Sequence, residues 1–146
     1  MAEQLTLRII TPERTVVDTP ASSVRVPATD GSMGIFPRHA AMVAALDAGE
    51  LIFKQDGEET RLFVAGGFAD VRDNTLRILT PAGEKPEEID VERAQEAERR
   101  ARERLKPLRT DLTAESAEID VMRATAALRR AIMRLKVYGY ASKRGH

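Results

Sequence analysis

Residues 1–82 show the alternation of apolar and polar positions that is typical of β-strands. Five short segments in this region are rich in β-branched residues and alternate at least in part: LTLRII (5–10), SSVRVPA (22–28), GELIFKQ (49–55), TRLFVAGGF (60–68) and NTLRIL (74–79). Many short strands with no helical pattern between them are typical of an all-β sandwich or barrel. The pattern therefore predicts an all-β domain in the first part of the chain.

Glycine, aspartate and asparagine mark the expected turns between these strands. Asp56-Gly57 and Asp73-Asn74 each separate two apolar segments, and residues of these types adopt a positive φ at low cost. Both pairs therefore predict β-hairpins. Gly66-Gly67 stands inside an apolar segment and predicts a bulge or a close approach of two backbones.

The pattern changes from strand to helix near residue 80. The segment TPAGEKPEE, residues 80–88, is polar and contains two prolines and a glycine, so we interpret it as a linker. Residues 87–106 are rich in strong helix formers, and Pro86 suits the first turn of a helix. A second helix is expected to run to about Tyr138 and to end at Gly139. Three candidates for its N-cap precede it: Thr110, Asp111 and Thr113.

The two expected helices carry nearly the same sequence. EIDVERAQEAERRARERL, residues 88–105, is followed by EIDVMRATAALRRAIMRL, residues 118–135. At about 100° per residue, three arginines of each helix fall within about 40° of one another: Arg93, Arg100 and Arg104, then Arg123, Arg130 and Arg134. An Ala/Leu stripe lies beside each arginine stripe: Ala94, Ala101 and Leu105, then Ala124, Leu128, Ala131 and Leu135.

Alanine allows close packing of helices, so the two stripes predict an antiparallel hairpin with the arginines along one side of the seam. Guanidinium groups gathered there would suit a phosphate or carboxylate ligand. A solvated face crossed by ion pairs, such as Glu96–Arg100, explains the same pattern. Both interpretations stay open on the pattern alone.

Charge supports a division into two modules. From Glu84 onward the chain has 15 Lys+Arg and 12 Asp+Glu, which leaves 8 and 11 of the 23 of each kind for the preceding residues. The first part therefore carries about −3 and the second about +3. We predict an all-β domain at 1–84 and a helical domain at 85–146.

Composition and motifs exclude several classes of protein. The chain has no Cys, so disulfides and thiolate metal sites are excluded, and no metal constellation is seen. No leader peptide and no membrane-spanning stretch is expected. The histidines are His39 and His146, and His39, in the turn-like segment GIFPRHAAM, is interpreted as structural. No nucleophile elbow, phosphate loop or dinucleotide fingerprint is present, so we expect no catalysis by this chain.

Four features together resemble the epsilon subunit family of bacterial F-type ATP synthases over essentially the whole chain: LRIITPERTVVD near the start, GSMGIFPRHAAMV at 31–43, LFVAGGFADVRDNTLRIL at 62–79, and the two repeated helices. The resemblance implies a β-sandwich of about ten strands followed by an antiparallel two-helix hairpin. It implies a non-catalytic rotor subunit of the proton-translocating enzyme, peripheral on the cytoplasmic side of the cell inner membrane. The implied partners are the gamma subunit, the c-ring and the alpha/beta catalytic subunits.

Some members of that family bind ATP through an Ile/Leu-Asp-x-x-Arg-Ala motif, which residues 89–94 match. Carried over by position, the implied ATP contacts are Glu84, Ile89, Asp90, Arg93, Ala94, Arg100, Arg130 and Arg134. ATP would act there as a regulatory ligand, with no cofactor required, and the hairpin would block ATP hydrolysis when extended. The connection between the helices is about seven residues longer than in the ATP-binding relatives.

The resemblance also implies a contact loop for the c-ring or gamma subunit, which contains Ser32, Arg38 and His39. Many relatives carry an acidic residue in place of Ser32 and a glycine in place of Arg38. Two alternatives to a rotor subunit remain: a free-standing ATP-binding sensor without catalytic activity, and an RNA-binding protein with a basic hairpin. The scarcity of aromatic residues, at 4%, disfavours RNA.

Overall fold

The computed structural model describes residues 3–106 and 114–144 of the chain. It divides into two compact units, Met1–Glu88 and Ile89–His146. The expected N-cap residues Thr110, Asp111 and Thr113 lie outside the described residues. The first unit contains β1 (Leu5–Ile10), β2 (Thr15–Ala21), β3 (Ser23–Ala28), β4 (Gly31–Ile35), β5 (Met42–Gln55), β6 (Glu58–Arg72), β7 (Thr75–Leu79), β8 (Gly83–Glu84) and the 3₁₀ helix η1 (Pro86–Glu88). The second unit contains α1 (Val91–Arg104) and α2 (Ala114–Arg144).

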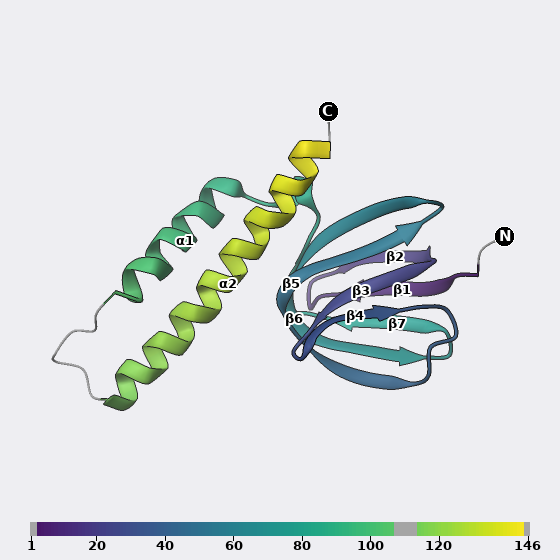
Figure 1. Ribbon diagram of the computed structural model, residues 1–146, viewed down its shortest axis with the longest axis horizontal. Coiled ribbons are helices and arrows are strands. Elements are labelled where there is room, and N and C mark those ends of the chain that lie inside the picture. Colours follow the sequence, from purple (N-terminus) through teal and green to yellow (C-terminus); the bar gives the residue numbers. More distant parts are fainter. Residues whose placement is uncertain (1–2, 107–113, 145–146) are drawn as a thin grey trace. The chain divides into compact units, whose positions relative to one another are not determined.

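The strands of the first unit pair in the order β2-β1-β7-β6-β5-β3-β4, and β8 pairs with β6. Every pairing is antiparallel except that of β1 with β7, which brings the first strand beside a strand near the end of the unit. The curved strands close into a sandwich (Figure 1). Apolar side chains from seven strands fill its interior, among them Leu7, Ile9, Leu51 and Ile78, each with no exposed surface.

The described strands number eight, whereas the resemblance implied about ten. β5 and β6 explain the difference, because each runs as one strand of 14 or 15 residues past a bend. The five predicted strands are present, but β2, β4, β8 and the first half of β5 were not expected. β2 and β4 lie at the ends of the strand order, where one face and one edge need no apolar partner. Their sequences, TVVDTPA and GSMGI, do not alternate regularly, although Val16, Val17 and Ile35 are buried in the core.

Both predicted hairpin turns are confirmed. Asp56 and Gly57 have φ angles of 52° and 81°, and Asp73 and Asn74 have φ angles of 50° and 58°. Two consecutive positive φ angles match the twist of the flanking strands, as in a type I′ turn. The strand pairs β5–β6 and β6–β7 follow directly from these two turns.

The glycine pair inside β6 allows the predicted close approach of two backbones. Gly66 and Gly67 have φ angles of 97° and 102°. A Cβ atom on Gly67 would lie 1.9 Å from the carbonyl oxygen of Leu79 on the adjacent strand. Only glycine allows β6 to pass β7 at this distance.

Residues 80–88, which the sequence pattern indicated to be a linker into a helix, belong to the first unit and pair with its sheet. The backbone of Ala65 donates to the carbonyl of Ala82, and β8 continues this pairing with β6. Thr80, only 4% exposed, accepts a hydrogen bond from the Ala65 amide and donates one to the Ala82 carbonyl. Buried backbone groups need such partners, so this segment pairs with the open side of β6.

The end of the unit is held by Glu88. Its carboxylate accepts a hydrogen bond from the Lys85 amide, 3.0 Å away, and forms an ion pair with Arg14. The Lys85 amide and the Arg14 guanidinium both favour the ionised form and hold the pKa of Glu88 below its usual value. Because these contacts hold Glu88 in the sandwich unit, the first α-helix begins after this residue, which is later than expected.

α1 begins at Val91 rather than near residue 87. The Asp90 side chain accepts a hydrogen bond from the Arg93 amide at 3.1 Å, which makes Asp90 the N-cap. α2 continues to Arg144, so the expected end at Gly139 was wrong. Gly139 keeps a negative φ, and glycine ends a helix when it turns left-handed. Its position costs about 1 kcal/mol relative to alanine, which a 31-residue helix tolerates.

A chain that ends at Glu88 is expected to fold into the sandwich without the helices, because all strand pairs lie within residues 5–84. It should melt cooperatively with a β-type circular dichroism spectrum. A chain that ends at Gly83 should melt at a lower temperature, because it lacks half of β8 and the Arg14–Glu88 ion pair. An unfolded 1–88 chain beside a folded full-length protein would show that the units depend on each other.

Candidate functional site: the arginine-alanine hairpin

The two helices pack along a seam of alanines, as the helical pattern predicted. Ala94 and Ala101 on α1 and Ala124 and Ala131 on α2 are each between 1% and 3% exposed. The helices run side by side in opposite directions (Figure 1). Alanine at all four positions makes this interface thin, since each side chain contributes a single methyl group.

Every alanine of the seam directly follows an arginine. The four pairs are Arg93-Ala94, Arg100-Ala101, Arg123-Ala124 and Arg130-Ala131. A residue one position before the seam is rotated by about 100° from it. In two antiparallel right-handed helices, this rotation carries the preceding residues to the same side of the seam. The hairpin therefore has one side on which arginines of both helices stand, and we call it the arginine side.

The arginines on the arginine side differ from those on the outer face of α1. Arg99 is held by Glu96 and Glu103, and Arg102 by Glu98, all on the same helix. The hydrogen bond from Arg99 also lowers the pKa of Glu96. By contrast, Arg93 and Arg130 form no ion pair within the described part of the protein. Arg93 is exposed and Arg130 is half-buried.

The expected Glu96–Arg100 pair is confirmed, at 3.6 Å between Arg100 Nε and Glu96 Oε1. Arg100 is nevertheless 58% exposed, so a surface pair of this kind holds it weakly. The arginine side therefore combines a partly engaged guanidinium at Arg100 with those of Arg93 and Arg130, which have no ion-pair partner among the described residues. Guanidinium groups without a protein partner are available to a phosphate or a carboxylate.

The other residues implied as ATP contacts have different surroundings. Asp90 is exposed, and its carboxylate already caps α1. Ile89 is buried, with 7% of its surface exposed, and Arg134 on α2 is half-buried. Glu84 lies half-buried in β8 of the first unit. The structure thus brings Arg93, Ala94, Arg100, Arg130 and Arg134 into one pair of packed helices.

The residues of the expected contact loop lie on β4 and in the connection between β4 and β5. Ser32 is exposed on the edge strand β4. Arg38 is exposed and has a φ of 62°, and its guanidinium pairs with Glu3 at 2.8 Å. A φ of this sign is one that glycine adopts freely and that a residue with a side chain disfavours. His39 follows, with its Nδ1 2.8 Å from the Ala40 carbonyl oxygen.

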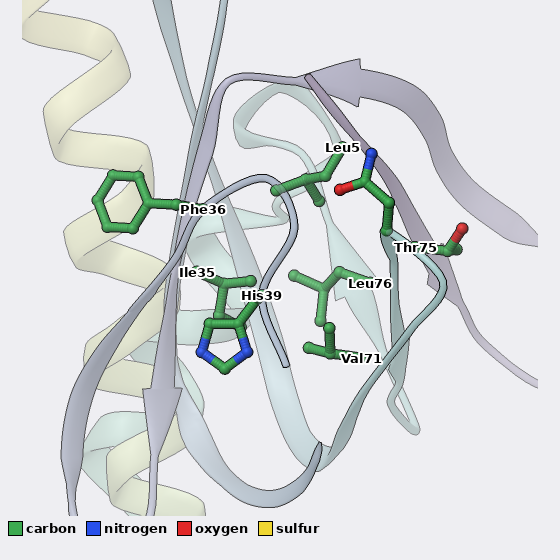
Figure 2. A pocket seen from close by; sticks show the side chains of 8 residues that line it. Leu5, Ile35, Phe36, His39, Val71, Thr75 and Leu76 are labelled. Carbon is green, nitrogen blue, oxygen red and sulfur yellow. The ribbon is translucent and has the colours of Figure 1, made fainter. Parts of the chain in front are cut away.

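A shallow depression lies beside this loop, and its space of about 140 Å³ includes open solvent (Figure 2). Its lining is mostly apolar and comes from β1, β4, β6, β7 and the loop: Leu5, Ile35, Phe36, His39, Val71, Asn74, Thr75 and Leu76. Figure 2 shows the Phe36 ring pointing away from Leu76 and Val71. Binding sites for small molecules usually enclose roughly 300–1,000 Å³. The depression is therefore too small for a nucleotide.

An exposed apolar patch on the outer face of the sheet was not foreseen. Phe68 is 55% exposed and lies opposite Leu79 on β7, which is 47% exposed. Phe68 also pairs with Ala45, so Val43, 69% exposed, is its diagonal neighbour on β5. The sequence holds one signal of this patch: Phe68 alternates with Gly67 and Ala69 along the strand, so it is expected on the opposite face from them. Apolar side chains grouped in this way are typical of a protein interface.

No group of three or more potential metal ligands occurs among the described residues. No helix within residues 3–106 and 114–144 is long and apolar enough to cross a membrane.

Comparison with known families accounts for nearly the whole chain. Residues 4–86 match the model of the ATP synthase delta/epsilon chain β-sandwich domain, and residues 87–139 match that of its long α-helix domain. The chain belongs to the ATP synthase delta/epsilon chain family. The ATP synthase epsilon chain of Symbiobacterium thermophilum is 52% identical over 109 residues, which are 74% of this chain and 78% of that one. That of Lawsonia intracellularis is 44% identical over 105 residues, 72% of this chain and 79% of that one.

Solved structures show the same fold at low sequence identity. A chain of the Euglena gracilis mitochondrial ATP synthase, in a complex of OSCP, F1 and c-ring, matches with a TM-score of 0.71 and 23% identity, covering 88% of this chain and 78% of that one. A chain of the Tetrahymena thermophila central stalk and c-ring matches with a TM-score of 0.61 and 17% identity, covering 93% and 97%.

Family membership decides between the functional alternatives. The chain is a non-catalytic rotor subunit of an ATP synthase, as the resemblance implied, and not a free-standing sensor or an RNA-binding protein. The enzyme is associated with a membrane, and this subunit is a peripheral part of it.

Proposed function

We propose that the helical hairpin of this rotor subunit restrains ATP hydrolysis, and that ATP bound along the arginine side holds the hairpin in its folded state. Within this proposal the ATP contacts are Arg93, Arg100, Arg130 and Arg134. Asp90 is left out of these contacts, because its carboxylate would repel the phosphates. Its role is to stabilise the start of α1 as the N-cap.

One observation carries the proposal: each buried alanine of the seam is preceded by an arginine, on both helices. Solubility alone would place charges on any outward face and would favour on-helix pairs such as Arg102–Glu98. Arg93 and Arg130 form no such pair within the described residues. A triphosphate beside the seam would supply the negative charge that these guanidinium groups lack.

The thin seam supports a hairpin with two states. Burial of apolar surface contributes about 25 cal/mol per Å², and alanine methyl groups offer little area. The packing of α1 on α2 therefore stabilises the folded hairpin only weakly. A ligand with several charge-assisted bonds can then shift the balance between the folded and extended hairpin.

The sandwich provides the surfaces that attach the subunit to the rotor. We assign the loop with Ser32, Arg38 and His39 to contact with the c-ring, and the apolar patch of Val43, Phe68 and Leu79 to contact with the gamma subunit. The arginine side of an extended hairpin would meet acidic surfaces of the alpha/beta catalytic subunits. The complex is then placed at the cell inner membrane, with this subunit on the cytoplasmic side.

Deletion of residues 89–146 from the assembled enzyme tests the restraint. ATP hydrolysis is expected to rise several-fold while assembly and ATP-driven ion pumping persist, because the deletion leaves the 1–88 unit complete with its Arg14–Glu88 pair. Hydrolysis is measured on purified complexes with a coupled assay, and subunit content by gel.

A matched control keeps the hairpin and replaces Arg99 and Arg102 by alanine, which removes two arginines held by on-helix pairs. This variant should hydrolyse ATP at the wild-type rate. An assembled 1–88 enzyme with unchanged hydrolysis would refute an inhibitory hairpin and leave the rotor assignment intact.

A further inference from the structure

The turn at Arg38 has an unusual backbone for a residue with a side chain. Its φ of 62° lies in the left-handed region, which glycine adopts freely and arginine disfavours. The arginine is exposed, and its surface ion pair with Glu3 acts on the side chain and leaves the backbone unconstrained. Some other contact must stabilise the left-handed turn.

That contact comes from Asn74, which lies 36 positions further along the chain in the β6–β7 turn. Asn74 Oδ1 accepts a hydrogen bond from the Arg38 amide at 2.8 Å. Asn74 Nδ2 donates to the Gln4 carbonyl oxygen at 2.9 Å. The backbone carbonyl of Asn74 also accepts from the Thr6 amide at 3.0 Å. One residue thus ties the loop between β4 and β5 to the N-terminal strand.

The side-chain amide suits both of its partners in one orientation only. The oxygen must face an N–H donor and the nitrogen must face a carbonyl acceptor. Asn74 is itself left-handed, with a φ of 58°, a conformation that asparagine tolerates better than most residues. A glycine at this position would keep the turn but lose both side-chain bonds.

We propose that Asn74 is a positioning residue for the contact loop: it fixes the left-handed turn at Arg38, and so presents Arg38 and His39 to the rotor. This inference rests on the proposed role of the loop in docking. The same segment borders the depression that His39 and Asn74 line, so a change in the turn would also move the His39 ring. Sequence alone gives no sign of this contact, because residue 38 lies in the connection between β4 and β5, whereas residue 74 lies in the β6–β7 turn.

The test uses the full chain with Asn74→Gly, which removes the two side-chain bonds without straining the turn. Asp73→Asn is the matched control, since Asp73 occupies the same turn with a φ of 50° and, within the described residues, its side chain forms no hydrogen bond to the loop. Amide hydrogen exchange measured by NMR should show Arg38 exchanging about 3- to 10-fold faster in Asn74→Gly. The control should leave that rate unchanged.

Asn74→Asp separates the two bonds. A carboxylate still accepts from the Arg38 amide but cannot donate to the Gln4 carbonyl. Slow exchange at Arg38 should therefore persist in Asn74→Asp. Unchanged Arg38 exchange in Asn74→Gly would overturn the inference directly.

Docking is measured as the affinity of each full-length variant for a purified complex of the gamma subunit and c-ring. Asn74→Gly should bind about 3- to 10-fold more weakly, and Asp73→Asn as the wild type does. Faster Arg38 exchange with unchanged affinity would overturn the positioning role. The double variant Arg38→Ala, His39→Ala tests the loop itself, and wild-type affinity there would refute the docking proposal without altering the exchange result.

Discussion

Replacing Gly67 by alanine is expected to destabilise the sandwich by about 3 kcal/mol or more. Two effects add at this position. A left-handed or positive φ costs a residue with a side chain about 1–2 kcal/mol, and Gly67 has a φ of 102°. The new Cβ would also lie 1.9 Å from the Leu79 carbonyl oxygen, so β6 and β7 would have to separate.

Gly57→Ala provides the matched control for the first effect alone. Gly57 has a φ of 81°, and nothing lies within 4 Å of the position of its added Cβ. The free energy of unfolding of this variant should be lower than that of the wild type by about 1 kcal/mol. Denaturant unfolding of both variants is monitored by circular dichroism. The comparison separates the cost of a positive φ from the cost of the steric clash with Leu79. Equal losses for Gly57→Ala and Gly67→Ala would show that β6 moves away from Leu79 at no cost.

Replacing Arg93 or Arg130 by alanine is expected to weaken ATP binding by about tenfold or more. A hydrogen bond to a charged group contributes roughly 1.5–3 kcal/mol, and 1.4 kcal/mol corresponds to a factor of ten. The start of α1 should survive Arg93→Ala, because Asp90 accepts from the backbone amide of residue 93 and not from its side chain. Lysine at either position should restore binding only in part, since its ammonium lacks the planar fork.

Isothermal titration calorimetry of the full chain at millimolar ATP measures this effect. Arg99→Ala and Arg102→Ala are the controls, because both arginines are engaged by glutamates of their own helix. They should bind ATP as the wild type does. An equal loss in all four variants would indicate attraction by overall charge rather than a site on the arginine side. No heat from the wild type would exclude the nucleotide site and leave the rotor assignment unaffected.

Features with a local cause could be predicted from the sequence. The turns at Asp56-Gly57 and Asp73-Asn74 follow from the demand for positive φ, which few residue types meet. The alanine seam follows from helical periodicity, because the same spacing occurs twice and the four alanines are all buried. The candidate ATP residues on the hairpin came partly from this periodicity and partly from the family resemblance.

Features that depend on distant partners could not be predicted in the same way. β8 forms because β6 leaves a side open near Phe63 and Val64, and nothing within the segment 80–88 signals a strand. The bond between Arg38 and Asn74 joins two separate turns. Glycine often ends helices, yet the backbone of Gly139 keeps a negative φ and α2 continues past it.

The parallel pairing of β1 with β7 has a consequence for synthesis of the chain. Thr6 pairs with Thr75, 69 positions later, so one edge of β1 has no partner until β7 has been made. At about 5–20 residues per second, the ribosome needs about 3–14 s to reach that point. Throughout this time this edge of β1 lacks its hydrogen-bond partners, although Leu5, Leu7 and Ile9 are at most 3% exposed in the finished sandwich. The nascent chain is therefore most vulnerable to aggregation before its seventh strand emerges, and a chaperone that binds short apolar segments would act on β1.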